Sequence, residues 1–121
     1  MPTPISLHLH QKTHTLDIEF DDGQSFSLSC EYLRVFSPSA EVRGHGAGPG
    51  KLQTGKSCVT ILAIEPIGNY AVKLIFDDGH RTGIYSWEWL YDLGVHQTRY
   101  WQDYLNRLTQ AGASREPEEK K

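Results

Sequence analysis

The chain contains short segments in which hydrophobic residues alternate with polar ones, the pattern of a strand buried on one face. Ile5, Leu7 and Leu9 show it first, with a serine and two histidines at the positions between and after them. Later segments alternate or are rich in β-branched residues, and turn residues separate them. The pattern predicts antiparallel strands over residues 5–10, 15–20 and 24–29, and again over residues 58–67, 70–76 and 81–85.

Two short helices are predicted where these groups of strands end. Ser29 and Ser86 are suited to cap helices over residues 30–36 and 87–93, because a serine oxygen accepts a hydrogen bond from the first helical turn. Gly94 follows the second of these segments and is interpreted as its C-terminal stop.

The sequence Phe-Asp-Asp-Gly occurs twice, at residues 20–23 and 76–79, each time between two predicted strands. Asp followed by Gly favours a tight turn, because Gly accepts positive φ without a steric clash. The segments 31–33 and 88–90, which follow the two turns, also match each other at nearly the same offset along the chain. We therefore predict a single α+β domain over residues 1–110, in which two antiparallel hairpin units pack with short helices and a C-terminal aromatic helix. Residues 111–121 are predicted to be a disordered tail.

Aromatic residues are concentrated near the end of this domain, where helical spacing predicts the final helix over residues 97–110. The simpler interpretation is a core closed by large rings. The alternative is a partner-binding segment at Tyr85, Trp87 and Trp89, since exposed aromatic residues are typical anchors of protein interfaces.

A glycine-rich stretch over residues 37–57 predicts a long loop without helix or strand. It contains no acidic residue after Glu41, and its basic residues make it a candidate anion-binding or partner-binding loop: Arg43, His45, Lys51 and Lys56. Residues 50–57 also match the phosphate-loop pattern Gly-x-x-x-x-Gly-Lys-Ser. A working phosphate loop joins a buried strand to a helix N-terminus. A glycine run and a β-branched stretch flank this match instead, so we interpret it as coincidental.

Composition and charge narrow the function classes. With 121 residues, of which 38% are hydrophobic and 22% charged, the chain suits one globular domain. A net charge of −3 argues against binding to duplex nucleic acid, which requires a basic surplus. The sequence has no apolar segment long enough for a membrane span and no signal-peptide pattern, so the expected compartment is the cytoplasm. Cys30 and Cys58 are expected to be thiols there, and one alternative is a small thiol enzyme that pairs Cys58 with His45 or His80.

Two motifs carry a resemblance to a known family: Glu-Val-Arg-Gly-His-Gly at residues 41–46, and Asp-Gly-His-x-x-Gly-Ile-Tyr-Ser-Trp-Glu-x-Leu at residues 78–90. By these motifs the chain resembles small bacterial proteins similar to the N-terminal domain of gamma-butyrobetaine hydroxylase, long described as a domain of unknown function. In the hydroxylases this domain accompanies a 2-oxoglutarate and iron oxygenase, which implies an accessory role. Related domains are fused to iron-sulfur carrier ATPases, which implies a second class of partner.

The resemblance also implies a zinc site, from which this chain departs. In the hydroxylases the domain binds zinc through cysteines after a Leu-Arg motif and through a later histidine. Here Ser-Pro-Ser at residues 37–39 stands where Cys-Pro-Cys is expected, and only His80 matches. We expect no structural zinc, and expect His80 to hydrogen-bond the turn backbone or a serine of residues 37–39. The alternative is a weaker iron or zinc site that combines His80 with Cys30, Cys58 or His45.

The sequence therefore favours a non-catalytic accessory or interaction module with a protein partner, for which an iron-sulfur carrier or an oxygenase is the implied class. The His-x-Asp pair of an iron oxygenase does not occur in the chain. Two alternatives stay open: a metal-binding protein linked to iron-sulfur cluster handling, and the thiol enzyme.

Overall fold

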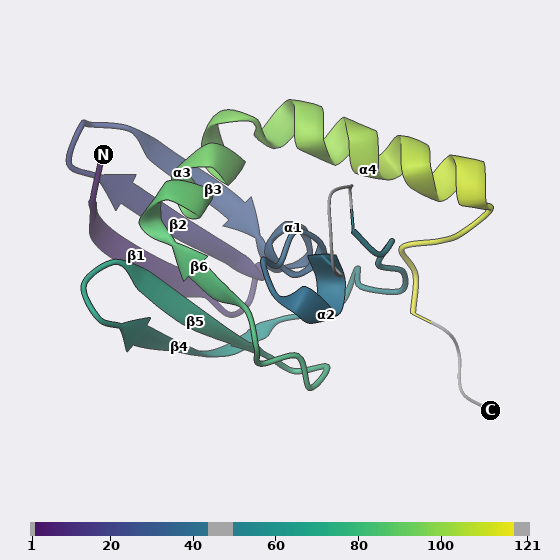
Figure 1. Ribbon diagram of the computed structural model, residues 1–121, viewed down its shortest axis with the longest axis horizontal. Helices are drawn as coiled ribbons and strands as arrows, with labels where there is room; N and C mark the ends of the chain where they lie inside the picture. The colour runs from purple at the N-terminus through teal and green to yellow at the C-terminus, as the bar shows by residue number, and fades with distance from the viewer. Residues whose placement is uncertain (1, 44–49, 118–121) are drawn as a thin grey trace.

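The computed structural model describes residues 2–43 and 50–117 of the chain. It contains two antiparallel three-stranded sheets, in the orders β1-β2-β3 and β4-β5-β6, together with helices (Figure 1). The strands are β1 (Pro4–His10), β2 (Thr15–Phe20), β3 (Ser25–Ser29), β4 (Ile61–Ile67), β5 (Ala71–Phe76) and β6 (Ile84–Ser86). The helices are α1 (Cys30–Val35), α2 (Ala40–Arg43), α3 (Trp87–Val95) and α4 (Gln97–Ala111). This arrangement confirms the predicted α+β class.

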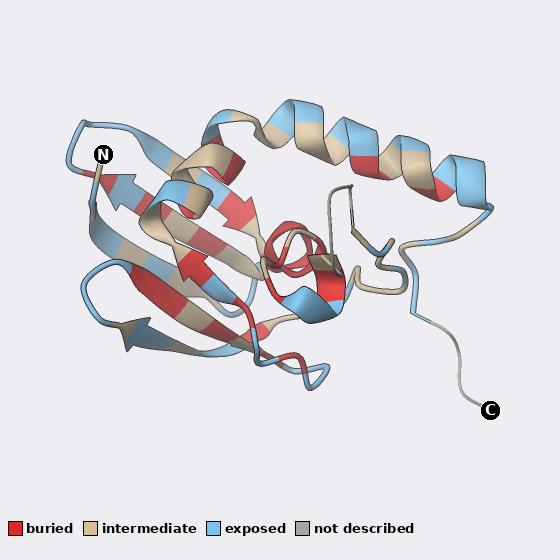
Figure 2. Ribbon diagram, in the orientation of Figure 1, coloured by how far each residue is buried: buried red, intermediate tan, exposed pale blue. Residues whose placement is uncertain are grey.

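One hydrophobic core joins the two sheets and the helices that follow them. Its buried side chains come from both sheets and from α1 and α3, and include Leu16, Leu28, Leu74 and Leu90. Burial of this apolar area is the main source of stability. A smaller cluster forms where the end of α1 meets α4, and the outer side of α4 is exposed (Figure 2). None of the described helices is both long and apolar enough to span a bilayer.

The helix caps follow the sequence closely. Ser29 Oγ accepts a hydrogen bond from the N–H of Tyr32 at 3.0 Å, and Ser86 Oγ accepts one from the N–H of Trp89 at 3.0 Å. These bonds satisfy backbone donors that have no partner within the helix. The aromatic helix α4 also lies where it was predicted, and Gly112 ends it in the left-handed conformation with φ at 62°.

Several local predictions were wrong. Gly94 lies within α3 rather than ending it. Its lack of a side chain makes room for a neighbouring ring, because a Cβ atom here would be 2.4 Å from Phe26. Residues 40–43 form the helical turn α2, started by Ser39, whose Oγ accepts from the N–H of Glu41. The glycine content of the surrounding stretch hid this turn. Strands β4 and β6 also begin later than predicted. Ile5, which was expected on the buried face of β1, is 63% exposed because a register shift interrupts the alternation of that strand.

The internal repeat is longer than the duplicated turn. Strand β4 follows the pattern of β1, and each of these strands has a register shift close to its first residue. The offset between the starts of β1 and β4 also separates the start of α1 from that of α3, and the start of α2 from that of α4. Each half of the chain therefore consists of three strands followed by two helices.

The two halves contact each other reciprocally. Tyr32 donates its hydroxyl hydrogen to the carbonyl of Leu93, and Trp89, at the matching position, donates its indole N–H to the carbonyl of Phe36. Two further matched pairs are in close contact: Phe26 with Gly94, and Gly83 with Ser37. Reciprocal contacts of this kind are those of a two-fold axis. The halves thus pack as a pseudo-symmetric pair within one domain.

The start of the segment that was predicted to be a disordered tail is packed against the domain. Gly55 and Ser57 donate their backbone N–H groups to the carbonyls of Ser114 and Arg115, both at 3.0 Å. Arg115 also forms two hydrogen bonds with the carboxylate of Glu31, of 2.8 and 2.7 Å. Bidentate pairing of this kind is stronger and more specific in geometry than a single neutral hydrogen bond, and it connects Arg115 to α1. Residues 118–121 lie outside the described part of the chain.

Candidate functional site

A groove of about 280 Å³ lies between the end of α1, the end of α2, and helices α3 and α4. We call it the arginine–aromatic groove. Four aromatic residues line it: Phe36, Trp89, Tyr100 and Tyr104. Its charged residues are Arg43, Asp103 and Arg107, so it carries one excess positive charge.

The polar atoms of the aromatic side chains in this groove are bonded to the protein itself. Trp89 Nε1 donates to the carbonyl of Phe36 at 3.0 Å, and Tyr104 Oη donates to the carbonyl of Gln53 at 2.8 Å. Tyr100 Oη donates to a carboxylate oxygen of Asp92 at 2.8 Å. The rings are therefore fixed in place, and what they offer the groove is mainly apolar carbon.

The arginines are held near these rings. The guanidinium carbon of Arg43 lies 5.5 Å from the centre of the Trp89 ring, a cation–π contact. Arg107 donates one N–H to the carbonyl of Gly50 at 3.1 Å. An arginine carries five N–H donors, so most of the donors of Arg107 are not used by this bond.

The groove joins two groups of residues that the sequence predicted separately. Arg43 comes from the candidate anion-binding loop and Trp89 from the candidate aromatic segment. The other predicted members that the structure describes do not line it. Lys56 bonds to Asp78, Trp87 donates its indole N–H to the carbonyl of Asn69, and Lys51 is exposed. His45 lies outside the described residues.

Tyr85 was also a candidate for the partner-binding segment, and the structure places it in the core. It is completely buried, and its hydroxyl donates to the carbonyl of Leu33. Burial raises the pKa of Tyr85 above its ordinary value. A residue in this position contributes to stability and does not reach a partner.

Asp103 and Arg107 were not singled out from the sequence. Their signal is the spacing along α4, because residues 100, 103, 104 and 107 stand at positions i, i+3, i+4 and i+7 and so lie on one helix face. The sequence could show that this face exists but not which element packs beside it.

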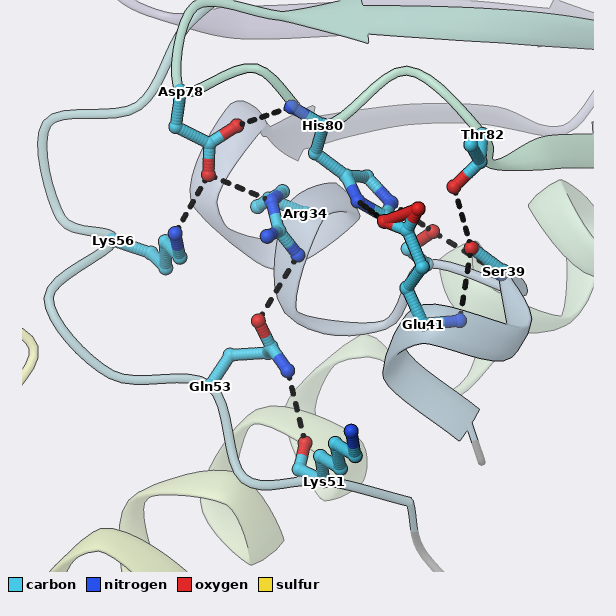
Figure 3. A network of polar contacts seen from close by, with 10 residues as sticks. Arg34, Ser39, Glu41, Lys51, Gln53, Lys56, Asp78, His80 and Thr82 are labelled. Atoms are coloured by element: carbon cyan, nitrogen blue, oxygen red, sulfur yellow. Dashed lines mark hydrogen bonds and ion pairs between the residues drawn. The ribbon is translucent and has the colours of Figure 1, made fainter. Parts of the chain in front are cut away.

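A second polar cluster surrounds the second Phe-Asp-Asp-Gly turn (Figure 3). Asp78 Oδ2 accepts hydrogen bonds from Lys56 Nζ at 2.6 Å and from Arg34 Nε at 2.9 Å. Burial alone would raise the pKa of Asp78, but bonds from Lys56 and the His80 N–H, with the charge of Arg34, outweigh it and lower the pKa to about 2. Lys56 is thus committed to an ion pair. No helix follows residues 50–57 before β4, so the phosphate-loop pattern lacks the helix that such a loop requires.

His80 lies next to this turn, buried, with 5% of its surface exposed. Its Nε2 and Ser37 Oγ share a hydrogen bond of 2.8 Å, which confirms the predicted contact with a serine of residues 37–39. Nδ1 lies 3.4 Å from Glu41 Oε2, and Ser39 Oγ shares a bond of 2.6 Å with Thr82. Burial first, and the charge of Arg34 second, lower the pKa of His80, although Glu41 and Asp78 act in the opposite direction. The ring is therefore neutral at pH 7.

This arrangement does not fit the zinc site that the resemblance implies. The groups that face the His80 ring are the Ser37 hydroxyl and the Glu41 carboxylate, whereas the zinc site of the family takes cysteine thiolates beside the histidine. Among residues 2–43 and 50–117, no group of three or more His, Cys, Asp or Glu side chains is placed to hold a metal. Cys30 is buried, which raises its thiol pKa, and Cys58 is exposed beside Ser57. Both ring nitrogens of His80 face Ser37 and Glu41 rather than either thiol.

Comparison with known proteins agrees with the resemblance. Two structures solved by NMR in solution are similar, each with a TM-score of 0.84. One is 45% identical over 99% of this chain and 94% of its own, and the other is 56% identical over 100% of this chain and 90% of its own. A crystal structure from Acidithiobacillus ferrooxidans, of a protein of unknown function in the DUF971 family, is 34% identical. It covers 76% of this chain and 92% of its own, with a TM-score of 0.65. No curated protein matches the chain. The sequence model for the gamma-butyrobetaine hydroxylase-like N-terminal domain matches residues 7–91, so the chain belongs to that family.

Proposed function

We propose that this protein is a non-catalytic interaction module that binds a protein partner at the arginine–aromatic groove. The observation that carries the proposal is the contact of Arg43 with Trp89 in an open groove whose aromatic rings are fixed by the protein's own hydrogen bonds. Aromatic and arginine side chains are the most frequent anchors of protein interfaces. Rings that are already ordered lose little conformational entropy when a partner binds.

The titratable groups of the described residues support this proposal over the thiol enzyme. A thiol nucleophile requires a base within hydrogen-bond reach. The nucleophile of that alternative is Cys58, whose sulfur contacts Ser57, while both ring nitrogens of His80 are occupied by Ser37 and Glu41. His45, the other candidate base, lies outside the described residues. Within the proposal, the partner classes implied by the resemblance, an iron-sulfur carrier or an oxygenase, are the first candidates.

Affinity capture from the native cell extract tests the proposal. The bait is the full chain, as wild type, as Arg43→Glu in the groove, and as the matched control Arg81→Glu at an exposed position outside it. We expect one or more proteins to be retained by wild type and by Arg81→Glu but lost with Arg43→Glu, while all three baits unfold at similar temperatures. Equal capture by all three baits, or no specific capture by wild type, would contradict the proposed docking site.

A further inference from the structure

We infer that the arginine–aromatic groove recognises an acidic residue next to an aromatic side chain in the partner. This inference rests on the proposed function and specifies the chemistry of the segment that is bound. Its two components are the apolar ring surface and the two guanidinium groups.

The arginines of the groove differ in their contacts from the arginines that form ion pairs in the described chain. Arg34 is paired with Asp78, and Arg115 with Glu31. Arg43 and Arg107, by contrast, contact a ring and a backbone carbonyl. Guanidinium groups match a carboxylate with two parallel N–H bonds. A carboxylate is therefore the partner group that complements the charge of this groove.

The size and the remaining charge of the groove limit the occupant further. A volume of about 280 Å³ lies just below the usual range for small-molecule sites. It suits one large side chain with the group beside it, rather than a whole helix. Asp103, which is exposed at the groove, disfavours a polyanion such as nucleic acid, and so does the net charge of −3.

Three capped dipeptides test the inference: acetyl-Glu-Phe-amide, acetyl-Gln-Phe-amide and acetyl-Glu-Ala-amide. Each is titrated into the full ¹⁵N-labelled chain, and the indole N–H signals are followed by NMR. Trp89 reports on the groove, while Trp87 and Trp101 lie outside its lining and serve as internal controls. We expect the Glu-Phe probe to shift the Trp89 signal saturably. Loss of the carboxylate or of the aromatic ring should each weaken binding by about tenfold or more.

Variants identify the side chains that bind the carboxylate of the probe. In Arg43→Gln and in Arg107→Gln, the preference for Glu-Phe over Gln-Phe should fall by about tenfold, whereas the control Arg81→Gln should keep it. The amide spectra of the variants show whether each is folded. Equal affinity for Glu-Phe and Gln-Phe in wild type would overturn the carboxylate assignment and leave the docking proposal standing. Failure of the Glu-Phe probe to shift Trp89 would overturn the inference as a whole, while the capture experiment judges the proposed function separately.

Discussion

The two Phe-Asp-Asp-Gly turns have the same internal structure in different surroundings. Asp22 and Asp78 each accept a hydrogen bond from the N–H two residues later, at 2.9 and 3.1 Å, and the following glycines have φ of 89° and 90°. In each turn the phenylalanine N–H donates to a carbonyl of the returning chain, at 2.8 and 3.0 Å. Local sequence therefore determines the geometry of the turn in both halves.

The second carboxylate oxygen of each aspartate shows the difference. Asp22 Oδ2 accepts from the hydroxyl of Tyr91 at an exposed position. Asp78 Oδ2 accepts from Lys56 and from Arg34, whose side chain is only 9% exposed. Both aspartates thus bond across the two halves, but Asp22 does so at the surface with a neutral hydroxyl, whereas Asp78 pairs with charged side chains that are largely buried. The same local turn is therefore used in two settings, and only in the second does its aspartate pair with charged side chains.

The largest loss of stability expected from this difference is that caused by Asp78→Ala. The substitution removes the carboxylate that pairs with buried Arg34 and should lower the free energy of unfolding by about 3 kcal/mol. Urea denaturation measures the loss. The matched variant Asp22→Ala removes the same local turn bond without leaving a buried charge unpaired, so its loss of unfolding free energy should be clearly smaller. Equal losses would show that the ion pair adds nothing to the turn.

The halves also differ at the matched positions Gly94 and Ser37. Gly94 lies against Phe26, so Gly94→Ala should lower stability by about 2 kcal/mol through overpacking, although alanine is the better helix former. Thermal unfolding of a double-mutant cycle checks the cause. If Phe26 is the obstacle, Gly94→Ala should cost much less in the background of Phe26→Leu, whereas an unchanged cost would place the strain elsewhere.

Acid should affect the second turn more than the first. The pKa of Asp78 is lowered from 3.8 to about 2, so its contribution is complete above pH 3.8 and is lost as the pH falls toward 2. For a side chain that is 20% exposed, this amounts to about 1–2 kcal/mol. His80 adds a loss in the same direction below its ordinary pKa of 6.5, because the folded protein disfavours its protonation. Stability measured from pH 7 to pH 2 should depend less on acid in Asp78→Asn than in Asp22→Asn.

The features that the sequence predicted are those that depend on neighbours along the chain. Ser29 and Ser86 cap their helices, the glycine turns have the expected backbone, and α4 follows from its own periodicity. The contact of His80 with Ser37 could be predicted from the sequence for a different reason. Family resemblance placed both residues at one site, and the missing cysteines left a hydrogen bond as the simplest replacement.

The features that were missed depend on which elements pack together. Whether Gly94 ends a helix or makes room for a ring is decided by Phe26 on a distant strand. The role of Arg107 depends on α4 lying beside the end of α2, and the burial of Tyr85 depends on α1 covering it. Single-residue propensities contain none of this information.

The smallest predicted effect tests the pseudo-two-fold contact itself. Tyr32→Phe removes the hydrogen bond to the carbonyl of Leu93 and keeps the ring, so it should cost about 1 kcal/mol. The bond joins the halves, and therefore the amide signals that change most should include those at the end of α3, around Leu93, rather than only those near residue 32. Tyr91→Phe is the matched comparison, because its hydroxyl also bonds across the halves, to Asp22, but at the surface, so its cost should be smaller. If the spectral changes of Tyr32→Phe stayed within the first half, the hydroxyl would not couple the two halves, and the symmetry would be one of shape alone.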